Sequence, residues 1–475
     1  MIRLFALASF VYQSAAAIVL IFVLSHILAP AEYTTFSLAL ASSQFLCVLM
    51  FEWLQLAGVR FLAAAHGEEA ARLRSSLIAA ALLSATLLIG AGSAASIAGP
   101  LPLQVVGLGL TLAVLQGFAD LNLMMIRVSD RLAAAAALLT LRATLLLAAP
   151  VAGALMFGTT TATLAGGVLG QTATLVVGWL AYRPPLQKVT FHVLLSTWRH
   201  FARYGIPAAG ASVIHLSVPV MMRFIVISGL AAAGPAATAG FSMAVDLLQR
   251  PFAVIIAAIH TISYPDVVAQ FEHRTKQESR DAIGRFYDFI LCTTIVMLGG
   301  LIGFLPDAGR LFIPADVLTS FLSYGAATAV FYFFHVHLQS TLAVIPHLTT
   351  SSVRLVVIAA CQLALVSLFT TLAVARSLSP ASVVTSATIA TGVVTILGSG
   401  PAIRNRATPR WSVVAGATVA AMVIGASEML PSESPVWLAA KIAIAAVAVA
   451  LVAWHGNFLS ATGGTDLQRR SRDKS

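Results

Sequence analysis

Long apolar runs alternate with short segments that contain Pro, Gly and charged residues along the whole chain. A helix that crosses a bilayer needs about 20 mainly apolar residues. The apolar runs predict fourteen such helices, at 4–28, 33–59, 77–98, 101–126, 132–157, 160–181, 205–229, 236–262, 286–305, 317–345, 355–375, 381–403, 411–430 and 436–455. The pattern therefore predicts an all-α polytopic membrane protein with about 14 transmembrane helices.

Two segments of the chain repeat each other. Residues 29–39 (APAEYTTFSLA) align without gaps with residues 234–244 (GPAATAGFSMA), five positions are identical, and Gln44 then matches Gln249. Each segment leads into an even-numbered run, and the offset of 205 residues spans six predicted helices. This offset predicts two parallel six-helix lobes, related by an axis along the membrane normal, with the last two helices appended.

The repeat divides the chain into predicted parts. The segment between the lobes places Trp198 and Phe201 opposite Lys188 and Arg199 at helical spacing, which predicts an amphipathic helix in the membrane interface. Residues 266–285, the most charged stretch, predict a solvated helical loop. The parts are an N-terminal six-helix lobe (1–181), a cytoplasmic amphipathic linker (182–204), a C-terminal six-helix lobe (205–403), appended helices 13 and 14 (404–455) and a basic cytoplasmic tail (456–475).

The composition agrees with a membrane protein. Hydrophobic residues make up 59% of the chain and charged residues only 10%, whereas a soluble domain contains about 25% charged residues. The mean hydropathy of +0.92 leads to the same conclusion. The net charge of +10 does not indicate a nucleic-acid partner, because basic residues in short cytoplasmic loops set membrane topology.

The positions of Lys and Arg test the predicted topology. Twenty-two of the 28 fall in the N-terminus, in the loops after even-numbered helices or in the C-terminal tail. The loops after odd-numbered helices contain only Arg310 and Arg376, with Lys441 near the last of them. Because cytoplasmic loops carry an excess of Lys and Arg, we expect both termini in the cytoplasm. The first apolar run is too long for the core of a signal peptide and predicts an uncleaved helix.

Five charged residues lie deep within the predicted helices: Glu52, Arg142, Arg223, Asp246 and Arg250. A charge in hydrocarbon costs roughly 2.5–3.5 kcal/mol, and the sum of about 12–18 kcal/mol exceeds the net stability of most proteins. These side chains must therefore face partners or water. A structural ion pair or a snorkelling side chain is the alternative for each of them, above all for Glu52 and Arg250 near helix ends.

The tightest group of candidates lies on the seventh and eighth predicted helices. Asp246 and Arg250 are four residues apart, so they share a helix face and are expected to pair. Pro251 follows directly and predicts a hinge. Arg223 lies in the outer half of the seventh helix, and His215 precedes it by two turns on roughly the same face.

These residues predict an anionic substrate. A cavity lined by Arg223, Arg250 and Arg142 would be cationic, and guanidinium groups suit phosphate oxygens. Arg223 is the best candidate for binding a diphosphate. The candidates for coupling or gating are Asp246, Glu52, His215 and Pro251.

Other titratable residues carry weaker signals. His335 and His337 are possible proton carriers, but two residues apart on one helix they cannot bind the same metal ion. The cysteines Cys47, Cys292 and Cys361 are expected to be buried, and Asp120, Asp288 and His260 are expected at the cytoplasmic interface. Nucleotide-binding, hydrolase and metalloprotease motifs are absent, so we predict a transporter without catalytic residues, metal or cofactor.

Six strings in the chain carry a family resemblance. They are ILAPAEYTTFSLAL (27–40), EWLQLAGVRFLAAA (52–65), ARYGIPAAG (202–210), MMRFIVISGL (221–230), AAGPAATAGFSMAVDLLQRPF (232–252) and SYPDVVAQF (263–271). They resemble motifs of bacterial oligosaccharide and polysaccharide (Wzx-like) flippases, which belong to the multidrug/oligosaccharidyl-lipid/polysaccharide (MOP) exporter superfamily. The resemblance covers residues 1–75 and 200–275.

The resemblance implies a MATE/MOP-like fold with two six-helix lobes in a V and two extra helices. It implies a flippase that moves undecaprenyl-diphosphate-linked oligosaccharide across the bacterial cytoplasmic (inner) membrane by alternating access, for exopolysaccharide or O-antigen synthesis. The implied partners are this lipid-linked oligosaccharide, membrane lipids, a polysaccharide polymerase and a chain-length regulator.

The sequence departs from the family pattern in places. Met222 replaces an Asp, residues 33–36 replace Gly-Leu-Tyr, and the first helix carries Gln13 but no charge, which argues against a lipid II flippase. A cation-coupled multidrug antiporter of the same superfamily stays open, although it would need more carboxylates. A membrane polymerase or glycosyltransferase would need a larger outer loop than residues 306–316, and a structural scaffold is the remaining alternative. The glycan and the coupling ion stay open.

Overall fold

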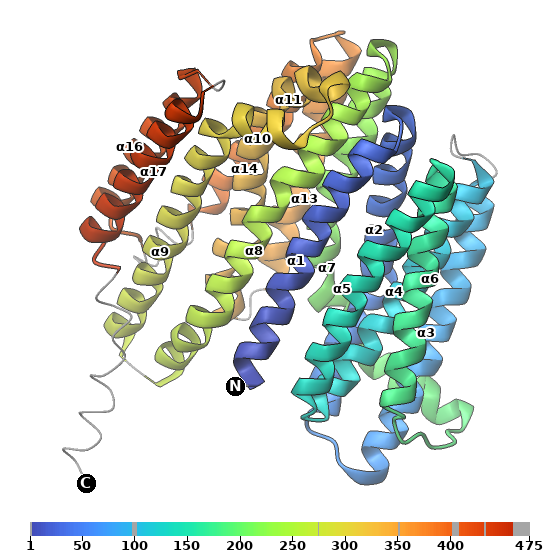
Figure 1. Cartoon of the computed structure of the whole chain (residues 1–475). Coiled ribbons are helices and arrows are strands. Elements are labelled where there is room, and N and C mark those ends of the chain that lie inside the picture. Colours follow the sequence, from blue (N-terminus) through green and yellow to red (C-terminus); the bar gives the residue numbers. More distant parts are fainter. Residues whose placement is uncertain are drawn as a thin grey trace.

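The protein is a bundle of long helices (Figure 1). The computed structural model describes residues 2–96, 102–273, 275–349, 352–400, 408–431 and 434–458, and no strand occurs among them. Fourteen helical segments in this part of the chain are long and apolar enough to cross a membrane. Each coincides with one of the fourteen predicted runs, so the predicted fold class is confirmed.

The helices form two lobes and an appended pair. The N-terminal lobe consists of α1 (Ile2–Ile27), α2 (Pro30–Leu62), α3 (Gly67–Ser96), α4 (Leu103–Val128), α5 (Leu132–Phe157) and α6 (Thr160–Ala181). The C-terminal lobe consists of α7 (Phe191–Leu230), α8 (Pro235–His273), α9 (Lys276–Gly303), α11 (Ala315–Val336), α13 (Ser352–Ala375) and α14 (Pro380–Gly398). Shorter elements of this lobe are η1 (Ala231–Ala233), α10 (Leu305–Phe312), the π-helix η2 (His337–Thr341) and α12 (Val344–Leu348). The appended pair is α16 (Trp411–Ala426), followed by η3 (Ser427–Met429), and α17 (Pro435–His455).

Local sequence determines where several helices begin. Pro30 and Pro435 occupy the first turn of α2 and α17, where a missing N–H costs no helical hydrogen bond. Thr159 caps α6, and Thr275 and Glu278 form a reciprocal capping box at the start of α9. The boundaries between the membrane-spanning helices are therefore encoded by residues adjacent to them.

Small residues allow close packing between neighbouring helices. A Cβ atom at Gly166 of α6 would overlap the carbonyl oxygen of Ala149 of α5, and one at Gly299 of α9 would overlap the backbone of Ala421 of α16. Glycine at such contacts lets helix backbones approach each other in lipid, where no hydrophobic effect drives association.

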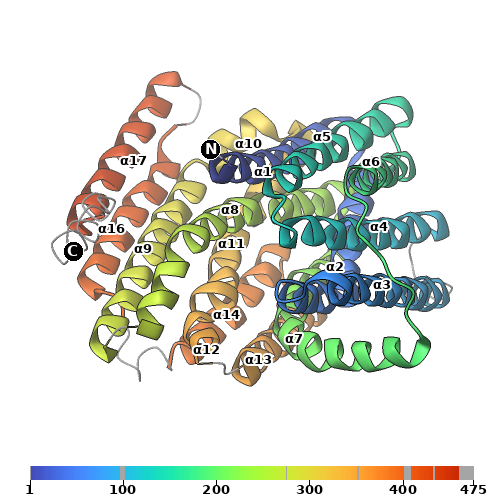
Figure 2. The ribbon, with the colours of Figure 1, turned by 90° about the horizontal axis from the view of Figure 1, so that it is seen from below.

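The predicted amphipathic linker and helical loop are helical from residue 191 and over most of 266–285. The amphipathic segment and the seventh membrane-spanning helix form one helix, α7, of 40 residues, and Figure 2 shows its first part beside α3. There Trp198 Nε1 donates a hydrogen bond to the carbonyl oxygen of Ser76 at 2.9 Å. The predicted loop at 266–285 is mostly helical, because α8 continues to His273 and α9 begins at Lys276. The amphipathic stretch is continuous with the seventh membrane-spanning helix, whereas the charged stretch includes the end of α8 and the start of α9.

The lobes meet along their first two helices. α2 contacts both α7 and α8, and α1 contacts α8. The hydroxyl oxygens of Thr34 and Thr238 are 3.2 Å apart, near the start of the two helices that carry the repeated strings. Contact between equivalent helices is what an axis along the membrane normal requires of two parallel lobes.

Ion pairs between described residues attach the appended helices. Lys441 of α17 is fully buried, and its Nζ lies 2.6 Å from Asp307 Oδ2 of α10. Asp288 of α9 accepts hydrogen bonds from the backbone N and the Nε of Arg410, each at 2.6 Å. Asp288 is therefore buried with a partner from far along the chain, and its place at the membrane interface stays a prediction. Beyond residue 458 the predicted basic tail lies outside the described residues.

Single-cysteine labelling tests the predicted orientation. In a Cys361→Ala background, exposed residues of the Lys/Arg-rich end, such as His66, Lys188 and Gln277, are replaced by cysteine one at a time. A membrane-impermeant maleimide should label each of them only from the cytoplasmic side, because these segments carry the excess of basic residues. Labelling of any of them in intact cells would contradict the orientation.

Candidate functional site

A cavity of about 390 Å³ lies between the two lobes. α1, α2, α4, α5 and α6 line it on the N-terminal side and α8 on the C-terminal side. Its wall is mainly apolar, with the polar side chains Gln13, Ser14, Gln44, Gln116, Arg142, Thr163, Gln171, Asp246 and Arg250. An apolar cavity with a few convergent polar groups is the usual form of a ligand site. We call it the central cavity.

Arg142 of α5 lines the central cavity and forms an ion pair with Asp120 of α4. Its Nη1 lies 2.5 Å from Asp120 Oδ1, and its Nε has no hydrogen-bond partner among the described residues. Asp120 lies more than two turns before the end of α4 at Val128, and its place at the membrane interface stays a prediction. This carboxylate compensates the charge of Arg142.

Asp246 pairs with Arg223 rather than with Arg250. Arg223 Nη1 of α7 is 2.7 Å from Asp246 Oδ1 of α8. The other carboxylate oxygen, Oδ2, accepts hydrogen bonds from Tyr33 Oη at 3.1 Å and Ser37 Oγ at 2.7 Å, both on α2. Arg223 Nη1 also donates to Ser37 Oγ at 2.9 Å. We call these four residues the inter-lobe latch, because they join α2 of one lobe to α7 and α8 of the other.

The inter-lobe latch explains how Arg223 is tolerated within the bundle. Arg223 is 5% exposed and is not among the residues that line the central cavity. It therefore does not snorkel to the interface. Tyr33 and Ser37 were not singled out from the sequence, because a hydroxyl in an apolar run gives no signal of the partner that it meets.

Arg250 has a different environment from Arg142 and Arg223. It lies one turn after Asp246 on α8, is only partly buried and lines the central cavity. It forms no ion pair with any residue that the structure describes. The carboxylate oxygens of Asp246 accept hydrogen bonds from Arg223, Tyr33 and Ser37 instead. The pair of Asp246 with Arg250 that the sequence predicts within α8 therefore does not form.

The other candidate residues lie outside the central cavity. Glu52 is partly buried in α2 and interacts electrostatically with Asp120. His215 of α7 is buried, and its Nδ1 is 3.2 Å from Gln362 Oε1 of α13. Pro251 lies within the continuous helix α8, so the hinge stays a prediction.

The three cysteines differ in their exposure. Cys47 and Cys292 are buried as expected, whereas Cys361 is exposed on the surface of α13. An apolar run does not reveal which face of its helix turns toward lipid. In the described part of the chain, no group of three or more His, Cys, Asp or Glu side chains could hold a metal ion.

Comparisons with known proteins identify the fold. No protein-family model and no curated protein matches the sequence. The solved structure of lipid II flippase MurJ in an inward closed conformation matches with a TM-score of 0.68 and 13% identity, over 96% of this chain and 99% of that chain. A MATE structure in complex with MaL6 matches with a TM-score of 0.55 and 13% identity, over 87% and 99% of the chains. The inward-facing structure of a MATE family transporter of the MOP superfamily matches with a TM-score of 0.54 and 14% identity, over 86% and 96%.

The chain has the fold of MurJ and MATE transporters. Its fourteen apolar helices among the described residues are those of a multi-pass membrane protein. At this level of identity the likeness concerns the fold and not the substrate. The described side chains of α1 from Ala8 to Ile27 include no Asp, Glu, Lys or Arg, and the distinction from lipid II flippases that rests on this helix stays a prediction.

Proposed function

We propose that the protein is a flippase that moves undecaprenyl-diphosphate-linked oligosaccharide across the bacterial cytoplasmic membrane by alternating access, for exopolysaccharide or O-antigen synthesis. The MOP-type fold and the family strings of the sequence support transport of a lipid-linked substrate. Both termini then lie in the cytoplasm. The polysaccharide polymerase and the chain-length regulator are the partners that this pathway would require.

The observation that carries the proposal is the unpaired guanidinium group of Arg250 in the central cavity. Asp120 compensates Arg142 and Asp246 compensates Arg223, so Arg250 supplies the excess positive charge. A diphosphate loses hydration when it enters an apolar cavity, and fixed cations must offset that cost. The planar fork of an arginine donates two N–H groups to phosphate oxygens at once.

Arg142 is the second candidate for contact with the diphosphate. Its Nη1 is bonded to Asp120, but its Nε has no partner in the described chain. Arg142 lies on the N-terminal lobe and Arg250 on the C-terminal lobe, so a diphosphate between them would contact both lobes. We place Arg223 in the inter-lobe latch rather than in direct contact with substrate.

Amide side chains suit the sugar part of the proposed substrate. Gln13, Gln44, Gln116 and Gln171 line the central cavity from the N-terminal lobe. An amide both donates and accepts hydrogen bonds, as sugar hydroxyls do. Gln171 is 1% exposed, and neither its nitrogen nor its oxygen has a partner among the described residues. Buried polar groups are almost always hydrogen-bonded, so an unpaired amide favours a polar ligand.

A cation-coupled multidrug antiporter is the second candidate, favoured by the MATE-like fold and by Asp246 in the cavity wall. A cationic drug needs a carboxylate that is free to bind it. Asp246 is already bonded to Arg223, Tyr33 and Ser37, which argues against this function.

Binding measurements separate the two functions. The full-length protein in nanodiscs is titrated with undecaprenyl diphosphate, undecaprenyl monophosphate and the organic cation ethidium. We expect saturable binding of the diphosphate, about tenfold tighter than the monophosphate, because the additional phosphate contacts add roughly one charged hydrogen bond. Binding of ethidium without binding of the diphosphate would support the antiporter instead.

A further inference from the structure

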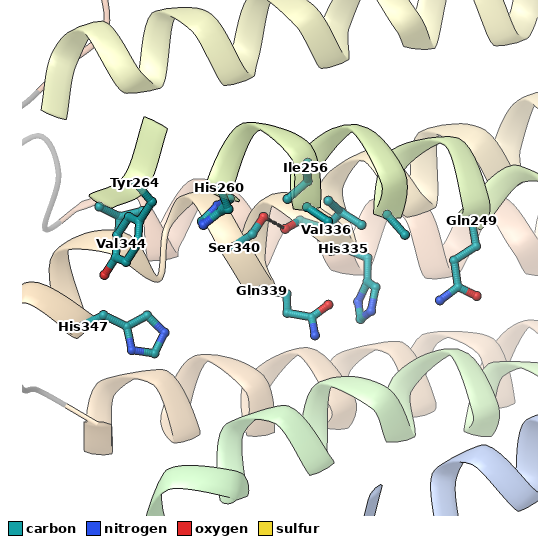
Figure 3. A pocket seen from close by; sticks show the side chains of 12 residues that line it. Gln249, Ile256, His260, Tyr264, His335, Val336, Gln339, Ser340, Val344 and His347 are labelled. Atoms are coloured by element: carbon teal, nitrogen blue, oxygen red, sulfur yellow. Dashed lines mark hydrogen bonds between the residues drawn. The ribbon is translucent and has the colours of Figure 1, made fainter. Parts of the chain in front are cut away.

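A second cavity, of about 570 Å³, lies within the C-terminal lobe, between α8 and the segment formed by α11, η2 and α12. Three histidines line it: His260 of α8, His335 of α11 and His347 of α12. Figure 3 shows His347, Gln339 and His335 following one another along this cavity. We call it the histidine cavity. No Asp, Glu, Lys or Arg of the described chain lines it.

The histidine cavity extends from the Lys/Arg-rich end of the bundle to its interior. His347 lies one residue before the end of its membrane-spanning segment, at Leu348, whereas His335 lies 12 residues earlier, which corresponds to roughly 18 Å of helix. The volume is many times the approximately 30 Å³ of one water molecule, and Gln249, Gln339 and Ser340 offer it hydrogen bonds. The cavity is therefore large and polar enough to hold water between that end and His335.

His335 forms part of a buried hydrogen-bonded cluster at the inner end of the cavity. Gln362 Nε2 of α13 is 2.9 Å from His335 Nδ1, and Gln362 Oε1 is 3.2 Å from His215 Nδ1 of α7. Gln362 also donates to Thr391 Oγ1 of α14 at 3.5 Å. His215, His335 and Gln362 are all less than 4% exposed. The amide bridges the two imidazoles.

The bridge allows only one of the two imidazoles to be charged. A protonated histidine donates from both ring nitrogens and needs an acceptor at each. The amide presents its oxygen to one ring and its nitrogen to the other, so it accepts from only one Nδ1–H at a time. Protonation of His335 therefore requires the amide to turn its oxygen toward His335 and its nitrogen toward His215. The geometry leaves room for one charged imidazole, and the orientation of Gln362 would then depend on which ring carries the charge.

The neighbouring His337 provides a contrast. It is 3% exposed and does not line the histidine cavity. Its Nε2 is 2.9 Å from Thr294 Oγ1 and its Nδ1 is 2.7 Å from Thr341 Oγ1, so both ring nitrogens already have hydroxyl partners. The π-helix η2 begins at His337, and such segments are frequent at functional sites.

The histidine cavity lies next to the inter-lobe latch. The ring of Tyr332, one turn before His335, has its centroid 6.2 Å from that of His335, and it interacts electrostatically with Arg223 and Asp246. Ala253 of α8 lines both the histidine cavity and the central cavity. A positive charge at His335 would therefore act on the groups that hold the lobes together.

Few titratable groups surround His335. α7 contributes His215, with a ring centroid at 5.9 Å, and α11 contributes Tyr332. α8 contributes His260 and Tyr264, and α12 contributes His347. Burial raises the pKa of Tyr264, so its hydroxyl stays protonated at neutral pH. The polar contacts from α13 and α14 are made by Gln362 and Thr391, which do not titrate. Of the charged residues of α8, Asp246 and Arg250 line the central cavity, and Asp266 and Glu272, nearer the Lys/Arg-rich end, line neither cavity.

We propose that the His215–Gln362–His335 cluster is a one-proton site, loaded through the histidine cavity, and that the proton is the coupling ion of the transport cycle. Imidazole is the side chain that titrates near neutral pH, and no carboxylate in the cavity would favour a metal cation. A buried imidazolium is costly in a closed apolar site and less costly in a hydrated one. Two conformations that differ in hydration of the cluster therefore bind the proton with different affinities, which is the requirement for coupling. This proton site depends on the proposed function only for the identity of the transported substrate.

Spin-label distances test the coupling. Nitroxide labels are attached to cysteines at Met156→Cys of α5 and Leu311→Cys of α10, in a Cys361→Ala background. Double electron–electron resonance between them reports the separation of the lobes at the Lys/Arg-poor end. We expect the wild-type distance distribution to shift between pH 8 and pH 5. The shift should be lost in His335→Gln and Gln362→Leu and retained in the matched control His337→Gln. An unchanged wild-type distribution, or a shift that persists in His335→Gln, would overturn the proposal.

A second measurement does not depend on the folding of any variant. Exchange of the imidazole C2 proton in the wild-type protein, followed by mass spectrometry, reports the protonation of each histidine. His335 should show a sigmoidal dependence on pH between 5 and 8, and His337 should exchange slowly throughout. A flat profile for His335 would contradict the site. A normal pH response without diphosphate binding would refute the proposed substrate and leave the proton site standing; the reverse result would refute the proton site alone.

Discussion

Replacement of Arg250 by glutamine is expected to weaken binding of undecaprenyl diphosphate by about 10- to 100-fold, because a hydrogen bond to a charged group contributes about 1.5–3 kcal/mol. Arg250 lines the central cavity without an ion-pair partner among the described residues, so its removal leaves no uncompensated charge behind. Protein levels and folding should therefore stay close to those of the wild type. Arg250→Lys should retain part of the affinity, because an ammonium group supplies the charge but not the fork.

The control for this prediction is Arg376→Gln. Arg376 is exposed beyond the end of α13, so the variant makes the same change in net charge away from the central cavity. Affinity is measured in nanodiscs, and export is measured by complementation of a deletion strain, with lipid-linked oligosaccharide quantified on each side of the membrane. Equal affinities of Arg250→Gln and Arg376→Gln would show that Arg250 does not bind the diphosphate.

The inter-lobe latch gives the second large expected effect. Asp246→Asn leaves the guanidinium of Arg223 buried without its carboxylate, and breaking a buried ion pair in this way costs about 3–5 kcal/mol. The cost falls on the conformation in which α2 contacts α7 and α8, and not on one in which these helices separate. A penalty of this size shifts the ratio of two conformations by at least about 100-fold. We therefore expect the variant to open at the Lys/Arg-poor end.

Double substitutions identify the partner of Asp246. Asp246→Asn/Arg223→Gln removes both buried charges and should return the closed state toward the wild-type population. Asp246→Asn/Arg250→Gln should not, because Arg250 is not the partner in the structure. Tyr33→Phe, which loses one hydrogen bond to the carboxylate, should have a smaller effect of about 1 kcal/mol.

The readout is the accessibility of the central cavity. A cysteine at Leu40, which lines the cavity, is exposed to an impermeant maleimide in vesicles of each orientation, with Cys361 replaced by alanine. Asp246→Asn should increase the labelling rate from the Lys/Arg-poor side and not from the other side. An unchanged rate from both sides would mean that the inter-lobe latch does not control access.

The number and order of the membrane-spanning helices could be predicted from sequence. In lipid each backbone polar group must be satisfied within the bilayer, so a helix of sufficient apolar length is the only form that an isolated run can take. The runs, the positions of Lys and Arg and the repeat at residues 29–39 and 234–244 all depend on local composition or spacing. The lengths of α7 and α8 were underestimated because the same argument says nothing about a helix after it leaves the lipid.

The charged residues could be found from sequence, but their partners could not. The cost of a charge in lipid identified Arg142, Arg223, Asp246 and Arg250 as candidates, but the pairing of Asp246 with Arg250 that their spacing predicts does not form. The packing of α2, α7 and α8 determines which guanidinium group pairs with the carboxylate of Asp246. The hydroxyls of Tyr33 and Ser37 that also contact this carboxylate lie more than 200 residues away in the chain. The bridge from His215 through Gln362 to His335 likewise joins three helices. Sequence by itself therefore determined the helices and their buried charges, because both follow from the cost of polar groups in lipid. Only the tertiary structure decided that Arg250 is the guanidinium group left unpaired in the central cavity, because ion pairing depends on distances between helices that are remote in the chain.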